Sequence, residues 1–149
     1  MKEMKKFIGL IGIMLLMVSI VSARGKVTRD VSLLPVEAQE MIKTYFPKAP
    51  VSYMKIDKNL FRTEGYDVFL SDGTELEFDA KGRWTEVESR SQSVPDSLVP
   101  MSIRKYVGRY YDDQKVKKIK HDRHGYELEL VNGLELKFDN RGKFLRLDD

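Results

Sequence analysis

Carboxylates that recur two positions apart are the side chains in this sequence best suited to acid–base chemistry. Glu75 and Glu77 form one such pair, and Glu127 and Glu129 form another further along the chain. Residues two apart on a strand share a face, so each pair could supply a general acid and a general base. The solvated face of a strand has the same spacing without catalysis, and the repetition of the pattern favours that interpretation. We therefore expect no catalytic residues and no enzymatic activity.

The composition supplies few ligands for a metal or a cofactor. The chain has no cysteine and two histidines, His121 and His124, which lie at a predicted hairpin turn. A structural zinc site normally needs four ligands, and we interpret these histidines as turn residues in solvent. Asp79 and Asp139 begin turns, but neither is followed by the distal glutamate of a calcium loop. Serine-triad, phosphate-loop and dinucleotide motifs are also absent from the sequence, so we expect no metal and no cofactor.

The amino terminus has the pattern of an export signal. Three lysines within the first six residues precede an uncharged, mostly apolar run at residues 7–23. The run ends in the small residues Ser22 and Ala23, which fits cleavage after Ala23. It is shorter than the ~20 residues that a membrane-spanning helix needs. We therefore predict a signal peptide at residues 1–23, a periplasmic or secreted protein, and no stable membrane anchor after cleavage.

Removal of the signal peptide changes the charge balance. The whole chain carries 26 basic and 23 acidic residues, a formal net charge of +3. Residues 1–23 contain three lysines and one glutamate, so the mature chain has 23 basic and 22 acidic residues. Nucleic-acid binding normally requires a concentrated basic face, and we expect no nucleic-acid partner. Lysines do cluster at residues 115–120, where they could protect an edge strand from unwanted pairing or contact an acidic partner.

The mature chain contains one motif twice. Residues 65–84 return as residues 125–144 without a gap, and most exchanges keep the physical type of the side chain. A coincidence over this length is improbable, so the pattern predicts a tandem duplication. We place the two copies at residues 34–89 and 94–149 and expect them to form one domain, with a serine-rich stretch between them.

Each copy predicts one helix followed by four short strands. Pro35 and Pro100 fit the first turn of a helix, and apolar residues recur at helical spacing after each of them. Asp72-Gly73 and Asn132-Gly133 suit the tight turns of β-hairpins. The predicted strands lie near residues 51–57, 64–71, 74–79, 84–89, 115–121, 125–131, 134–139 and 143–148. A unit of ~60 residues is marginal by itself. We therefore predict an α+β domain in which both meanders form one antiparallel sheet, with the helices on one face and an open face on the other.

These motifs resemble those of the PepSY-like, β-lactamase-inhibitor-like family of exported bacterial proteins. The resemblance is carried by Leu34-Pro35, by Ile42-Lys43-Thr44-Tyr45-Phe46-Pro47 and by residues 78–84, and the second copies extend it over nearly all of residues 34–149. It implies two helix-plus-four-strand units in a continuous sheet with a concave open face. It also implies an envelope or secreted location and a role in binding or inhibiting another protein. No contact residues are carried over, because no contact motif matches.

Alternation with period two assigns the strand residues to the two faces of the predicted sheet. On this basis the acidic side chains and Phe69 lie on the face away from the helices, and we place Trp84 and Phe144 there as well. Aromatic side chains with a charged surround are typical of binding hot spots. The candidate binding residues are Phe69, Trp84, Glu75, Glu77, Glu86, Phe144 and Arg146.

The sequence thus favours an exported, non-enzymatic module that presents its open sheet face to an unidentified envelope or secreted protein. Inhibition of an envelope or secreted hydrolase is one form that this function could take. The alternative is a protein that binds a small molecule or an envelope polymer with the same aromatic residues. An enclosed pocket would favour the alternative, whereas a broad and shallow face would favour protein binding.

Overall fold

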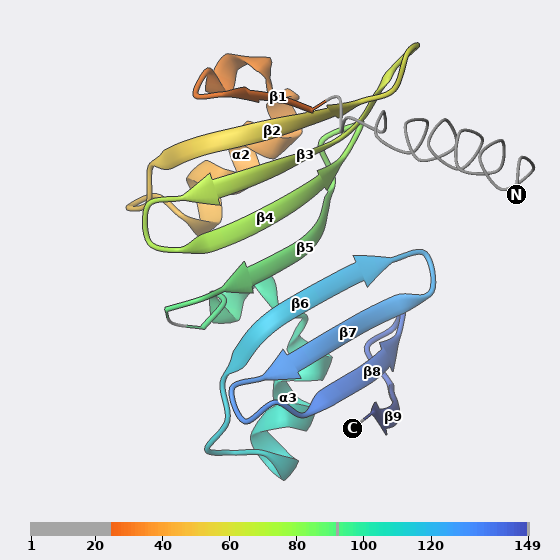
Figure 1. The fold of residues 1–149 in the computed structure, drawn as a ribbon. Coiled ribbons are helices and arrows are strands. Elements are labelled where there is room, and N and C mark those ends of the chain that lie inside the picture. The colour runs from red at the N-terminus through yellow and green to blue at the C-terminus, as the bar shows by residue number, and fades with distance from the viewer. Residues whose placement is uncertain (1–24, 92, 149) are drawn as a thin grey trace, which may run out of the picture.

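The computed structural model describes residues 25–91 and 93–148, which form an α+β fold with one nine-stranded antiparallel sheet (Figure 1). In this part of the chain each strand pairs with its sequence neighbours, so the sheet is a simple meander from β1 to β9. The strands are β1 (Gly25–Thr28), β2 (Val51–Lys58), β3 (Thr63–Leu70), β4 (Thr74–Asp79), β5 (Trp84–Ser89), β6 (Val116–Asp122), β7 (Gly125–Leu130), β8 (Glu135–Asp139) and β9 (Phe144–Asp148). The predicted signal peptide at residues 1–23, with its cleavage site after Ala23, lies outside the described residues.

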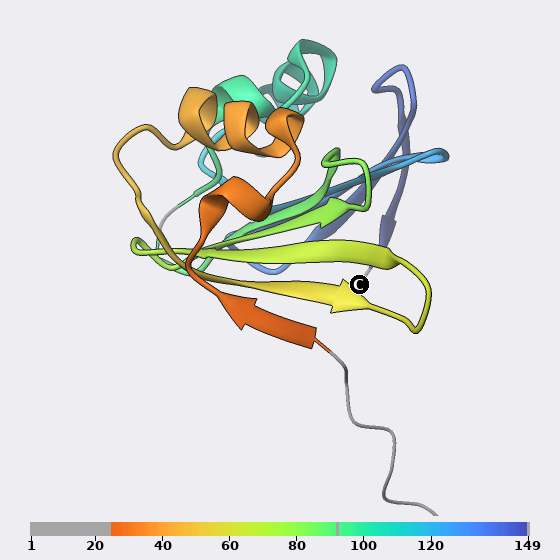
Figure 2. The ribbon, with the colours of Figure 1, turned by 90° about the horizontal axis from the view of Figure 1, so that it is seen from above.

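Two α-helices cover the same face of the sheet (Figure 2). The helical elements are η1 (Val31–Leu33), α2 (Val36–Tyr45), η2 (Asp96–Leu98) and α3 (Met101–Tyr110). Each α-helix begins directly after the proline that predicts it, Pro35 or Pro100, because proline needs no hydrogen-bond acceptor at a helix start. Within residues 25–91 and 93–148, no helix is long and apolar enough to cross a membrane.

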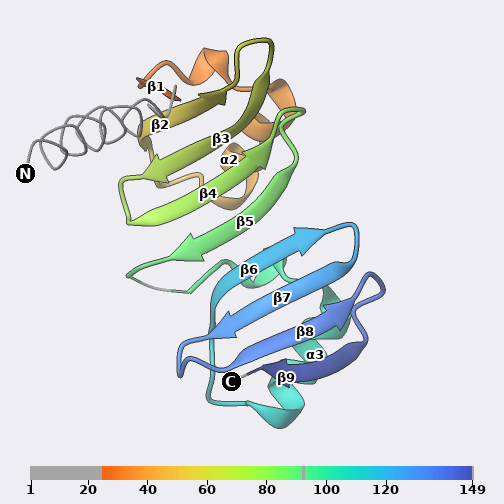
Figure 3. The ribbon, with the colours of Figure 1, turned by 45° about the vertical axis from the view of Figure 1, so that its right-hand side comes forward.

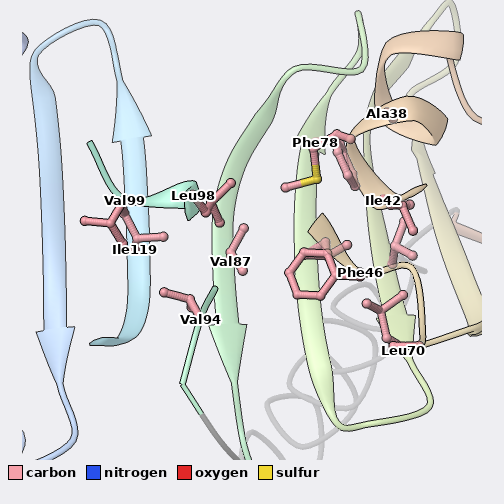
Figure 4. Close-up of a cluster of buried hydrophobic side chains, with 14 of the residues drawn as sticks. Ala38, Ile42, Phe46, Leu70, Phe78, Val87, Val94, Leu98, Val99 and Ile119 are labelled. Carbon is pink, nitrogen blue, oxygen red and sulfur yellow. The ribbon is translucent and has the colours of Figure 1, made fainter. Parts of the chain in front are cut away.

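One hydrophobic core lies between the helices and the sheet and runs through both halves of the chain. At its centre Val87 of β5 and Ile119 of β6 are fully buried and stand opposite each other across the two strands. Val94, Leu98 and Val99 from the segment between β5 and α3 lie beside them (Figure 4). The connection between the halves is therefore packed into the interior, and the halves share one core.

Two strands differ from their predicted place. β1 precedes the predicted copies, and its four residues are too few to show an alternating pattern; it pairs with β2 from Gly25–Asp57 to Thr28–Met54. β6 lies between β5 and β7, in the middle of the sheet. The interpretation of the lysines at residues 115–120 as protection for an edge strand is therefore wrong.

Bulges in β5 and β9 reverse the predicted orientation of two aromatic side chains. Glu77 of β4 stands opposite Glu86, but Phe78 stands opposite Trp84, so Thr85 is an extra residue in β5. The same shift occurs in β9, where Phe138 stands opposite Phe144. An extra residue breaks the period-two alternation. Trp84 and Phe144 therefore pack on the helix side against the core, and the prediction that they face outward is wrong.

The turn between β4 and β5 supports the start of α2. Gly82 in this turn has a φ of +86°, and a β-carbon there would lie 2.6 Å from Cβ of Pro35. Gly142 occupies the matching turn between β8 and β9, with a φ of +77°, and a β-carbon there would collide with Ser102 of α3. In each half the helix start packs directly on a turn that glycine fits without strain.

Gly82→Ala should destabilise the protein by about 2–4 kcal/mol. The left-handed backbone costs roughly 1 kcal/mol for a residue with a β-carbon, and overlap with Pro35 adds about 1–3 kcal/mol. Gly133→Ala is the matched control, because Gly133 has a φ of +90° but no atom within 4 Å of an added β-carbon. It should cost only about 1 kcal/mol. Urea denaturation measures both changes, and equal losses would contradict the supporting role of the turn.

Candidate protein-binding face

The sheet face opposite the helices carries mostly charged side chains, and no described element covers it (Figure 3). Antiparallel pairing aligns these side chains in two rows that cross the strands. The first row runs through Lys55, Asp67, Glu77, Glu86, Lys120, Glu127, Lys137 and Arg146. The second row runs through Tyr53, Phe69, Glu75, Glu88, Lys118, Glu129, Glu135 and Asp148. We call these two rows the open face.

Lys118 is the electrostatic centre of the open face. Its Nζ lies 3.7 Å from a carboxylate oxygen of Glu86, 3.5 Å from one of Glu88 and 3.7 Å from one of Glu129. Burial alone would lower the pKa of Lys118, but these three carboxylates outweigh it and raise the pKa above its usual value. The lysines of β6 therefore have acidic neighbours on both adjoining strands, and they link β5 to β7 across the junction of the two halves.

The acidic side chains of β3 and β4 have fewer positively charged neighbours than those around Lys118. Asp67 and Glu77 stand directly opposite each other. Burial, followed by the charge of Asp57, raises the pKa of Asp67 above its usual value. Burial and then the charge of Glu86 raise the pKa of Glu77 in the same way. Like charges in opposite positions destabilise a sheet, so this part of the open face favours a positively charged contact.

An aromatic pair lies beside these carboxylates. The rings of Tyr53 and Phe69 stack with centroids 4.5 Å apart and planes inclined by 14°. Nζ of Lys55 lies 5.3 Å from the Phe69 centroid, in range for a cation–π contact. Tyr53 is 38% exposed, which leaves ring surface available to a partner. Tyr53 is not among the residues predicted from the sequence to bind a partner, although its pairing with Phe69 in β3 places it on the same face.

The structure brings together part of the predicted binding set. Phe69 stands opposite Glu75, and Glu77 stands opposite Glu86, so these four form a contiguous group on β3, β4 and β5. Arg146 also lies on the open face, but on β9, where its Nε donates to Asp148 at 2.9 Å. It is therefore remote from the group. Trp84 and Phe144 are on the other face, and Phe144 stacks on Tyr106 of α3 with ring centroids 4.5 Å apart.

Trp84 instead lines a cleft where β5 and β6 separate. Pairing between these strands ends at Glu86 and Lys120, and a hollow of about 1250 Å³ lies beyond, bounded by α2, the β4–β5 turn and the β6–β7 hairpin. His121 lies 5.6 Å from Trp84 between ring centroids and stacks on Tyr126 at 4.3 Å. The cleft thus combines an aromatic wall with a charged rim, a feature that the sequence pattern did not reveal.

The histidines make contacts with neighbouring side chains. His121 stacks on Tyr126, and His124 Nε2 accepts a hydrogen bond from Nε of Arg123 at 3.0 Å. Across residues 25–91 and 93–148 no group of three or more histidine, cysteine, aspartate or glutamate side chains is arranged to hold a metal ion.

Comparison with known proteins finds one family model and several similar solved structures. Residues 64–146 match the family model described as "Putative beta-lactamase-inhibitor-like, PepSY-like". A solved structure from Bacteroides vulgatus, described as a "putative periplasmic protein of unknown function", is 50% identical over 84% of this chain and 99% of that chain, with a TM-score of 0.78. A second from the same organism, also described as periplasmic, is 41% identical over 86% and 99% of the two chains, with a TM-score of 0.78.

A third similar structure comes from Bacteroides thetaiotaomicron and is described as a "putative calcium-regulated periplasmic protein". It is 37% identical over 84% of this chain and 97% of that chain, with a TM-score of 0.78. Among curated proteins, none gave a match to the sequence.

Lys118→Met should lower the free energy of unfolding by about 1–2 kcal/mol at neutral pH, because it leaves three carboxylates of a partly buried cluster without their shared cation. Lys117→Met is the matched control on the same strand. Lys117 makes a single ion pair, with Glu129, and its side chain is 38% exposed against 24% for Lys118, so its loss should stay below about 0.5 kcal/mol. Chemical denaturation compares the two variants, and a larger loss of stability for Lys117→Met would contradict the central role of Lys118.

Glu77→Gln should change how stability depends on pH. The raised pKa of Glu77 means that the folded protein holds this proton more tightly than the unfolded chain does. Stability conferred by the protonated group is therefore lost as the pH rises above 4.5, the ordinary value, through the raised pKa. In the Glu77→Gln variant, the free energy of unfolding should therefore fall less as the pH rises. The difference should be on the order of 1 kcal/mol at most, because water screens the group. Glu40→Gln on the exposed side of α2 serves as control, and unfolding curves across this pH range test the difference.

Proposed function

Because the chain belongs to the PepSY-like family whose model it matches, we propose that it is an exported, non-enzymatic module that binds another protein through its open face. The observation that carries this proposal is the stacked pair Tyr53 and Phe69 on an uncovered sheet, bordered by charged side chains. An aromatic anchor within a charged surround is the usual composition of a binding hot spot.

The breadth of the open face supports a protein partner. Its two rows cross the sheet from β2 to β9, which is a scale suited to a macromolecular surface. Asp67, Glu77 and Glu86 follow one another in the first row, and Asp67 and Glu77 have no ion pair that offsets their mutual repulsion among the described contacts. A partner with a cationic group at this position would relieve that repulsion and would fix the orientation of the complex.

The proposal also covers the evolutionary origin of the two halves and the cellular location of the protein. The matching order of one helix and four strands in each half, together with the repeated sequence of residues 65–84 and 125–144, supports a tandem duplication. The export signal at residues 1–23, with cleavage after Ala23, and the relatives described as periplasmic support a periplasmic or secreted location. The partner would then be another envelope or secreted protein, and the family description makes inhibition of a hydrolase one form of the interaction.

A second candidate function is the binding of a small molecule or an envelope polymer in the cleft beside β5. Trp84 and His121 support this candidate, because their rings line a hollow of about 1250 Å³ with charged groups at its rim. Flat rings of this kind suit sugars and other planar or apolar ligand surfaces. The cleft also reaches Glu77, Glu86, Lys120 and Glu127 of the open face, but its aromatic residues differ from Tyr53 and Phe69. Substitutions of the aromatic residues therefore distinguish the two candidates.

Phe69→Ala combined with Tyr53→Ala should weaken binding to the envelope partner at least tenfold, because hot-spot aromatics contribute most of an interface's binding energy. The partner is identified by crosslinking to the mature protein in envelope extract, purified, and titrated against each variant. Val36→Ala on α2 is the control, since Val36 is 68% exposed but lies away from the open face.

Retention of full affinity by the folded double variant would refute binding through the open face. Trp84→Ala in the same titrations tests whether the protein partner uses the cleft: a loss of affinity there, with no loss in the Phe69 and Tyr53 variant, would move the protein contact to the cleft.

A further inference from the structure

The hairpin between β2 and β3 ends in two exposed apolar side chains. Leu60 is 73% exposed and Phe61 is 92% exposed, which makes them the most exposed of the large apolar residues in the described part of the chain. The matching hairpin in the second half, between β6 and β7, closes with Arg123 and His124 and carries no apolar residue at its tip. The tip in the first half is longer and exposes two apolar side chains, whose contact with water is unfavourable.

The hairpin tip has a defined conformation. Oδ1 of Asn59 accepts hydrogen bonds from the backbone N–H groups of Phe61 and Arg62, both at 2.9 Å. Nδ2 of Asn59 donates to Glu64 at 3.0 Å, and the backbone N–H of Asn59 donates to the carbonyl of Arg62 at 3.0 Å. These four bonds close the loop around Asn59. Leu60 and Phe61 are therefore held outward, away from the core.

The tip lies at the end of the sheet where the chain enters the fold. Gly25, the first residue of β1, stands opposite Asp57, which is three residues before Leu60. Figures 1 and 2 both show the start of β1 and the β2–β3 hairpin at the same end of the molecule. At strand spacings of about 5 Å between strands and 3.3 Å along them, this separation is on the order of 10–15 Å. The apolar run at residues 7–23 ends only two residues before Gly25.

We propose that Leu60 and Phe61 form a contact site for a lipid bilayer surface. While residues 7–23 engage a membrane during export, the attached fold begins within two residues of that segment, which keeps the β2–β3 end close to the lipid surface. Two apolar side chains at the tip can then enter the boundary between headgroups and acyl chains. Lys58 and Arg62, on either side of the tip, are placed to meet anionic headgroups.

The position of the tip favours a bilayer over an apolar pocket in a partner protein. A pocket could be anywhere around the molecule, whereas the membrane must lie near Gly25 whenever the apolar segment is inserted. Lys58 and Arg62 lie nearer to the tip than Asp57 and Glu64 do, so cations are the first charges to meet a lipid surface. This site is separate from the open face and does not depend on the protein-binding proposal.

Fluorescence in vesicles of phosphatidylethanolamine and phosphatidylglycerol tests the site. The full chain carrying Phe61→Trp is reconstituted into vesicles with or without brominated lipid, which quenches tryptophan at the acyl boundary. Trp84, the one native tryptophan, is half-buried in the core and gives the background signal in the unsubstituted chain. The control is Val131→Trp, since Val131 is 58% exposed in the β7–β8 turn at the opposite end of the sheet. Quenching is expected for Phe61→Trp and not for the control.

Vesicle sedimentation with the chain that starts at Arg24 provides a second measurement. This chain contains every described strand and helix, because the first described element, β1, begins at Gly25. Binding should be weak and reversible, as expected for a small apolar insertion. It should fall roughly tenfold with Leu60→Ser and Phe61→Ser combined, and Val131→Ser should leave it unchanged.

Equal quenching of the two tryptophan variants would overturn the proposal. So would vesicle binding that persists undiminished in the serine double variant. Absence of quenching together with a specific photocrosslink from position 61 to a protein would assign the tip to a protein pocket instead. Unchanged unfolding midpoints establish that the exposed substitutions leave the fold intact.

Discussion

The pairing of β5 with β6 is the contact on which the rest of the structure depends. On the helix side it buries Val87 against Ile119 and brings both halves into one core. On the other side it sets Lys118 among the carboxylates of Glu86 and Glu88. Each half alone has the size at which a hydrophobic core is marginal. A short strand junction, apolar on one face and ion-paired on the other, therefore converts two weak units into one continuous sheet.

This junction also separates two parts of the open face that differ in charge balance. At the centre the lysines of β6 balance the acidic side chains on both neighbouring strands, so little charge is left there for a partner. On β2, β3 and β4 the balance is poorer, because Asp67 and Glu77 face each other beside the stacked rings of Tyr53 and Phe69. The first half of the sheet thus combines exposed ring surface with negative charge that has no ion pair among the described contacts.

Much of this arrangement follows from local sequence signals, and the errors have local causes. Prolines, Asp-Gly and Asn-Gly turns and alternation predicted both helices, eight strands and the positions of Phe69, Glu75, Glu77 and Glu86 on the open face. Alternation fails where an extra residue enters a strand, so Trp84 and Phe144 were assigned to the wrong face. Strand order in a sheet depends on long-range contacts, so the central place of β6 was also missed. The cleft beside Trp84 arises from the separation of β5 and β6, which no single segment encodes.

The meander topology has a consequence for how the chain acquires its structure. Every strand in the described sheet pairs with the strand next to it in sequence. Most of these pairings close a short hairpin loop, and the two longer connections, from β1 to β2 and from β5 to β6, each contain an α-helix. A polypeptide that emerges amino terminus first can add strands in the order in which they are made. No early strand has to wait for a distant partner, which limits the time during which an unpaired edge is open to aggregation.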